Sequence, residues 1–229
     1  MVGFIIFLVV VGGVYYFYKS SPMSDPSEVK DRYKNRSDEQ KKVIRYFCID
    51  GCFAKTMSDQ EYDSLVKSYL SKTNFKQKGL SKVGLDESEL KEIDPVTFEG
   101  YLFDGKKTFA KRGKDGVWRS SAYQVSWLFF SATQVYLYQN TFNLDEDGKK
   151  EITEEYFYKD ITNFSTTSDT VETAYWDPKQ KKYLLENVDS NRFALTVPGD
   201  KFYCSMEQNE YTERAIQAMK AKLREKKSV

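Results

Sequence analysis

Hydrophobic positions divide the chain into stretches with different periodicities, and the first stretch has no period at all. Residues 2–18 read VGFIIFLVVVGGVYYFY, without one charged side chain. A helix of that length spans roughly 25 Å, which is enough to cross a thin bilayer. No small-x-small cleavage site follows, as a signal peptide would require. We therefore expect a transmembrane anchor at residues 1–18, made by Phe4, Ile5, Ile6, Phe7, Leu8, Val9, Val10, Val11, Val14, Tyr15, Tyr16, Phe17 and Tyr18.

Charge next to the apolar run predicts its orientation. Residues 19–37 hold two prolines, several serines and alternating charges, which is typical of a flexible linker. Basic residues continue from Lys19 to Arg45, whereas no charged side chain precedes the run. Because positively charged flanks stay on the cytoplasmic side, we expect a single-pass cell-membrane protein with its N-terminus outside and a cytoplasmic C-terminal body.

Residues 38–94 show the 3.6-residue period of amphipathic helices. The first predicted helix has apolar positions at Val43, Ile44, Phe47, Cys48 and Cys52, and the second at Tyr62, Leu65, Val66, Tyr69 and Leu70. Capping-box pairs precede the helical segments at Ser37–Gln40, Ser58–Glu61 and Asp86–Glu89. We predict a helical hairpin followed by one or two short helices.

From residue 95 the pattern changes to short alternating or aromatic segments separated by turn residues, which is typical of an antiparallel sheet. Turn-forming residues are expected at VDSN, residues 188–191, among other places. One last amphipathic helix closes the chain, with an apolar stripe at Tyr211, Ala215, Ile216, Met219 and Leu223. The fold class is therefore α+β, with an antiparallel β-domain over residues 95–229 that the terminal helix caps.

The segments YFYKDITNFST (156–166) and RFALTVPGDKFYCSM (192–206), followed by the terminal helix, resemble the bacterial pleckstrin-homology-like (PH-like) domains over roughly residues 120–227. The resemblance implies a seven-stranded, partly open barrel from residue 121 onward, capped by a helix and used for binding rather than catalysis. It leaves residues 95–119 as an additional hairpin. The loop FSATQ (130–134) lacks the basic residues of phosphoinositide-binding members, which argues against specific inositide recognition.

The amino-acid composition excludes several kinds of ligand and catalytic site. With 35 basic and 34 acidic side chains, a net charge of +1 gives no field that would attract nucleic acid. The chain has no histidine, which excludes Ser-His-Asp and Cys-His nucleophile systems and imidazole metal ligands. Cys48, Cys52 and Cys204 lack the spacing of a zinc or redox motif and are interpreted as packing residues. We expect no cofactor.

One acidic stretch resembles a calcium-binding loop, with Asn143, Asp145, Asp147, Gly148 and Glu154 at ligand or turn positions. Lysine follows at the inward position where an aliphatic residue is usual, and both flanks are rich in aromatic and β-branched residues. This favours the acidic turn of a β-hairpin, and we expect no metal there.

Together these features predict a membrane-tethered, non-enzymatic binding or scaffolding module whose partners are the bilayer and another protein. A basic group that could contact anionic lipid or the partner comprises Lys106, Lys107, Lys111, Arg112 and Lys114. Two alternatives remain open, which are an extracytoplasmic or membrane-proximal carrier of lipid or solute and a hydrolase built on paired carboxylates.

Overall fold

A computed structural model of the chain describes residues 33–48, 56–90, 93–103, 108–177 and 182–228. The described helices include the three that the predicted capping boxes precede. The helices are α3 (Asp38–Cys48), α4 (Asp59–Lys72), α5 (Phe75–Val83), the 3-10 helix η1 (Glu87–Glu89) and α6 (Glu210–Lys227). Ser37 and Gln40 exchange side-chain and backbone hydrogen bonds before α3, and Ser58 and Glu61 do so before α4. These reciprocal bonds satisfy N–H groups that a helix start leaves unpaired.

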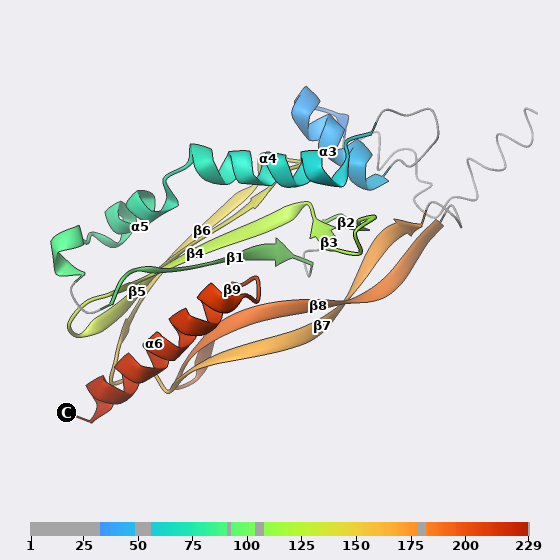
Figure 1. Cartoon of the computed structure of the whole chain (residues 1–229). Helices are drawn as coiled ribbons and strands as arrows, with labels where there is room; N and C mark the ends of the chain where they lie inside the picture. The colour runs from blue at the N-terminus through green and yellow to red at the C-terminus, as the bar shows by residue number, and fades with distance from the viewer. Residues whose placement is uncertain (1–32, 49–55, 91–92, 104–107, 178–181, 229) are drawn as a thin grey trace, which may run out of the picture.

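The strands form two sheets (Figure 1). Sheet A has the order β1-β4-β5-β6 and sheet B the order β3-β2-β7-β8-β9. Their bounds are β1 Val96–Leu102, β2 Ala110–Arg112, β3 Trp118–Ser120, β4 Ala122–Phe130, β5 Gln134–Asn143, β6 Lys149–Phe157, β7 Asn163–Asp177, β8 Lys182–Val197 and β9 Asp200–Ser205. All pairs are antiparallel except a single parallel bridge between β2 and β7. The class α+β is confirmed, with two curled sheets and a C-terminal helix.

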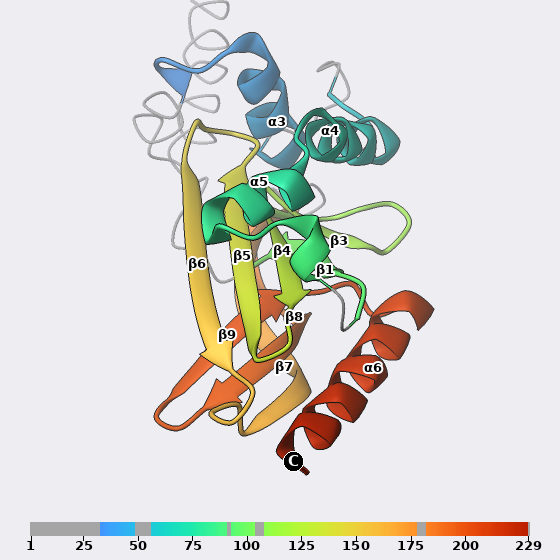
Figure 2. The same ribbon diagram turned by 90° about the vertical axis from the view of Figure 1, so that its left-hand side faces the viewer.

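Sheet A is covered on both faces, because its strands bury side chains in both directions. Val125 and Phe129 of β4 pack under α3–α5 in one apolar cluster, whereas Leu128 and Phe130 face sheet B in another. Figure 2 shows α3, α4 and α5 over one face, and sheet B with α6 on the other. The result is three layers, in which sheet A is the middle one.

Helix α6 closes the open side between the two sheets. Ile216, Met219 and Leu223 recur at helical spacing and pack into the same cluster as Phe164 of β7. The predicted stripe is thus confirmed at its centre. Its first member is wrong, because Tyr211 is exposed while the neighbouring Thr212 is buried. Thr212 is turned inward by the capping box that it forms with Asn209.

Three predictions about the β-region need correction. In the described part of the chain after residue 121 there are six strands, β4–β9, where the resemblance implied seven. Residues 95–119 are no separate hairpin, since β1 pairs with β4 along its whole length and only β2 and β3 form a hairpin with each other. The expected turn at residues 188–191 is instead the middle of β8, where Val188 and Ser190 are buried and continuous pairing with β7 holds the backbone extended.

The predicted anchor at residues 1–18 and most of the linker lie outside the described residues, as does Cys52. Within the described ranges, no helix has both the length and the apolarity needed to cross a bilayer.

Candidate functional site: the groove between β7 and α6

The two edges of sheet B are treated differently by the fold. At the β9 edge, buried glutamines of sheet A bind the backbone groups that a further strand would use. The side-chain oxygen of Gln124 accepts a hydrogen bond from the Ser205 N–H (2.8 Å), and Gln139 Nε2 donates one to the carbonyl of Tyr203 (2.9 Å). At Tyr203 and Ser205 these side chains take the place of a neighbouring strand.

On the other side of sheet B, β2 and β3 adjoin only one end of β7, and the rest of β7 forms an open edge. All of β7 pairs with β8, but its pairing with β2 consists of Ala110 opposite Tyr175 alone. In the part of the chain that the structure describes, residues 163–174 therefore have a strand neighbour on one side only. An edge strand of this kind presents a row of N–H and C=O groups that can bind another extended chain.

The ladder fixes which backbone groups face the opening. The Met206 N–H donates to the carbonyl of Asn191 (3.0 Å), so Asn191 directs its backbone groups toward β9. In an antiparallel ladder these directions alternate, and Arg192 consequently faces β7, where its partner is Thr167. Thr166 and Ser168 then direct their N–H and C=O groups away from β8, toward the open side.

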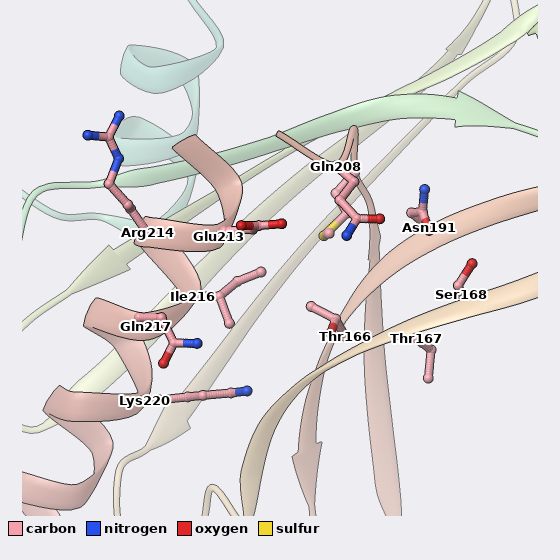
Figure 3. A pocket seen from close by; sticks show the side chains of 11 residues that line it. Thr166, Thr167, Ser168, Asn191, Gln208, Glu213, Arg214, Ile216, Gln217 and Lys220 are labelled. Carbon is pink, nitrogen blue, oxygen red and sulfur yellow. The ribbon is translucent and has the colours of Figure 1, made fainter. Parts of the chain in front are cut away.

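Helix α6 lies beside this edge and turns it into one wall of a groove of about 550 Å³ (Figure 3). The lining residues are Thr166, Thr167, Ser168, Asn191, Met206, Gln208, Glu213, Arg214, Ile216, Gln217 and Lys220. Met206 and Ile216 also belong to the apolar cluster between the sheets. The groove therefore combines an apolar base with hydroxyl, amide and charged groups, as ligand sites of this size commonly do.

The charged side chains of α6 differ in their direction. In Figure 3, Lys220 extends across the groove toward Thr166 and Thr167, whereas Arg214 points away from them. Arg214 forms an exposed ion pair with Glu210 at 3.6 Å, one turn earlier on α6. Lys220 is thus the cation that α6 offers to the groove.

A comparison of β6 with β7 shows that the open edge of β7 lacks the charged side chains that usually prevent strand association. The edge strand of sheet A, β6, carries charges at Lys149, Lys150, Glu151, Glu154 and Glu155. Charged side chains on an edge discourage association with other strands. The open part of β7, Asn163–Thr170, has Asp169 as its single charge and otherwise small hydroxyl residues, Asn163 and the inward-facing Phe164.

The described members of the basic group predicted from the sequence, Lys111, Arg112 and Lys114, have different surroundings. Lys106 and Lys107 lie outside the described residues. Lys111 is used internally, since its Nζ donates to the carbonyl of Tyr46 (3.0 Å) and lies 4.5 Å from the centre of the Tyr46 ring. Arg112 pairs with Glu186 at 3.6 Å, and Lys114 is exposed near the hairpin tip. Lys111 therefore stabilises the contact between β2 and α3.

A second group of charges holds the β2–β3 hairpin against α4. The side chain of Arg119 is 4% exposed and donates to both carboxylate oxygens of Asp63 at 2.7 Å and to those of Asp115 at 3.0 and 2.8 Å. The Arg119 side chain and the Val117 N–H lower the pKa of Asp115 from its usual 3.8 to about 2. Every donor direction of the guanidinium is matched, so this cluster is part of the fold.

The remaining candidate residues have structural places. Burial raises the pKa of the Cys204 thiol to about 12, so it stays protonated and unreactive in the core. Cys48 is half-buried at the end of α3.

The stretch that resembles a calcium loop is the β5–β6 connection, which confirms the predicted hairpin. Glu154 stands opposite Leu137 in the ladder, several pairs away from the turn. At the turn, Asn143 donates to Glu146 and Asp147 accepts from Gln40 of α3. Among the residues described, no three carboxylate or thiol side chains gather as a metal-holding group.

Sequence reasoning missed the groove, although one signal for it exists. Residues 163–170, NFSTTSDT, form a strand with almost no charge, next to a terminal helix whose outer face is strongly charged. Comparisons with protein-family models, curated proteins and solved structures found no match.

Proposed function

We propose that this chain is a membrane-tethered, non-enzymatic binding module with a PH-like β-domain on the cytoplasmic side. Its ligand is an extended peptide segment of another protein, which adds to β7 as a further strand and lies in the groove beside α6. The observation that carries this proposal is the open edge of β7, where the ladder turns the backbone groups of Thr166 and Ser168 away from β8, toward a side on which the described residues place no strand.

Strand addition suits the dimensions and the chemistry of the site. A new strand would lie about 4.8 Å from β7, with its backbone hydrogen bonds supplying affinity and alternate side chains entering the groove. The apolar base made by Met206 and Ile216 would accept one aliphatic side chain. The small serine and threonine side chains of β7 allow the backbone of a peptide to approach closely.

The packing between the sheets favours this module over a carrier of lipid or solute. Phe193 stacks on Phe98 at 4.6 Å between ring centres and meets Phe164 at 5.7 Å. These rings are fully buried and fill the space that a hollow carrier would use for cargo.

The perturbed acids give little support to a carboxylate-based hydrolase. Burial and the neighbouring Glu207 raise the pKa of Glu99, as a general acid would require. Glu99 is absent from the residues that line the groove, and the groove contains one carboxylate, Glu213. Glycoside hydrolysis requires two carboxylates on opposite sides of the bond that is cleaved.

A proline at the open edge tests the proposal. Ser168→Pro removes one outward N–H without removing a hydrogen bond to β8, while Ser168→Ala keeps the N–H and serves as the matched control. The full chain, held in lipid nanodiscs, is used to select from a phage-displayed library of random 12-residue peptides. We expect the wild type and the alanine variant to enrich the same peptides, and the proline variant to bind them about three- to tenfold more weakly, since one strand hydrogen bond is lost.

Circular dichroism and the melting temperature establish that the proline variant is folded. If it is not, Thr166→Lys together with Ser168→Lys places protective charges on the same edge without altering the backbone. Equal peptide binding by the folded edge variants would refute strand addition at β7, and the absence of any enriched peptide would refute peptide binding altogether.

A further inference from the structure

Lys220 is placed to read the sequence of an added strand. Its side chain extends from α6 into the groove, toward Thr166 and Thr167 of β7 (Figure 3). It forms no ion pair within the described residues, whereas Arg214 on the same helix is paired with Glu210. The ammonium group is therefore available at the position where side chains of an added strand would meet α6.

The side chains of α6 that line the groove change from acidic to basic along the helix. Glu213, Gln217 and Lys220 all line the groove, and they follow one another at three- or four-residue spacing. Glu213 and Lys220 are two helical turns apart, which is about 10 Å along the axis. The groove thus has an acidic end near the start of α6 and a basic end farther along it.

We propose that Lys220 selects peptides that carry an aspartate or glutamate opposite it, so that the ligand is an extended acidic segment of a partner protein. This inference rests on the proposed function and adds the chemistry of the ligand. A carboxylate in the strand would form a charge-assisted hydrogen bond with the ammonium, in a groove where neighbouring side chains partly exclude water. Such a pair favours binding by about three- to tenfold.

Anionic lipid would be a second source of negative charge for a lysine near a membrane. The direction of the side chain favours the peptide, because Lys220 extends toward β7 and not outward from α6. The groove also contains the side-chain amides of Gln217 and Asn191, which match the amide groups of a peptide strand.

A charge reversal tests the inference. The same library is selected against the full-length wild type and against Lys220→Glu in nanodiscs of neutral lipid. We expect Asp or Glu at one fixed position of the wild-type peptides, and Lys or Arg at that position for the variant. Lys201→Glu is the matched control, because Lys201 is exposed on β9, at the opposite edge of sheet B, and its replacement changes net charge equally. The control should keep the acidic preference.

Synthetic peptides then give the size of the effect. A selected peptide and its amide version, with Asp→Asn or Glu→Gln, should differ about three- to tenfold in Kd for the wild type and little for Lys220→Met. Peptides that depend on the β7 edge but show no acidic position would overturn the assignment of Lys220 alone. Failure to recover any peptide would overturn the proposed function as well. If vesicles containing anionic lipid bind the wild type more strongly than Lys220→Met, and the peptides show no such difference, lipid is the ligand of Lys220 and the inference is wrong.

Discussion

At the scale of single residues, the best-defined interaction is the pairing of Arg119 with two acids. The cation is almost completely buried, but the side chains of Asp63 and Asp115 are 35% and 47% exposed. Burying a guanidinium is tolerated only where its donors are matched, and here the matching acids come from α4 and from the hairpin itself. The contact therefore holds the β2–β3 hairpin against the helical layer. None of its three residues lines the groove.

The lowered pKa of Asp115 predicts a dependence of stability on acid. Because its pKa is about 2 in the folded protein and 3.8 when unperturbed, the contribution of this carboxylate is complete above about pH 4 and is lost as the pH falls toward 2. Urea unfolding between pH 4 and pH 2 should show a steeper fall in the midpoint for the wild type than for Asp115→Asn. Asp160→Asn, at an exposed position, should follow the wild type. Identical slopes for the wild type and Asp115→Asn would contradict the assignment.

Gly79 of α5 is required by close packing. A Cβ atom there would lie 3.0 Å from the ring of Phe129 and 3.1 Å from Cβ of Tyr138, both of which are fully buried. Gly79→Ala gains about 1 kcal/mol of helix propensity but incurs an overpacking cost of about 1–3 kcal/mol, so we expect a net loss of about 1 kcal/mol. Ser81→Ala, at an exposed position of the same helix, should be stabilising by about 0.5 kcal/mol. Chemical denaturation measures both, and a stabilised Gly79→Ala would show that the rings move easily.

At the scale of elements, local sequence signals predict the helices well. Ser58 and Glu61 form the predicted capping box, and the hydrophobic period identifies α4 and the buried side of α6. These signals succeed because each depends on residues a few positions apart. Asp86 and Glu89 also form their predicted box, although the helix that follows is a single 3-10 turn.

Strand pairing is harder to predict because it depends on distant residues. Residues 188–191, VDSN, have turn composition, but β7 pairs with all of them and keeps β8 extended. Nothing in the local pattern of β1 shows that it pairs with β4, more than twenty residues later in the chain. The candidate groove depends on a missing partner along β7, and the low charge of residues 163–170 does not by itself show that the partner is missing.

The β9 edge of sheet B gives a prediction at this scale. Gln124→Met retains the length of the side chain but leaves the buried Ser205 N–H without its acceptor. We expect a loss of about 1–3 kcal/mol in the free energy of unfolding. Gln60→Met, on the exposed side of α4, should change it by less than about 0.5 kcal/mol. An unchanged stability for Gln124→Met would mean that the β9 edge is not held by this side chain.

At the scale of the whole molecule, the proposed tether determines where the groove acts. An anchored domain meets its partners near the bilayer, where weak contacts gain from a raised effective concentration. We expect the full chain in the membrane fraction, and a chain lacking residues 1–18 in the soluble fraction. Fractionation followed by immunoblotting distinguishes these outcomes, and a full chain that is soluble after lysis would refute the tether.

Orientation is tested separately with a tag after residue 229. In intact cells the tag should resist added protease, and it should become sensitive once the membrane is permeabilised. Digestion in intact cells would place the β-domain on the outside and exclude the cytoplasmic module.

The position of α6 beside β7 also limits how many chains can join. When an added strand leaves a new open edge, further chains can pair with it in turn, and fibrils grow in this way. Residues of α6 line the same groove, so a strand that joins β7 in the proposed way would have a helix, and not an open sheet edge, on its other side. Crowding on a membrane surface would therefore produce occupied and vacant copies, rather than polymers.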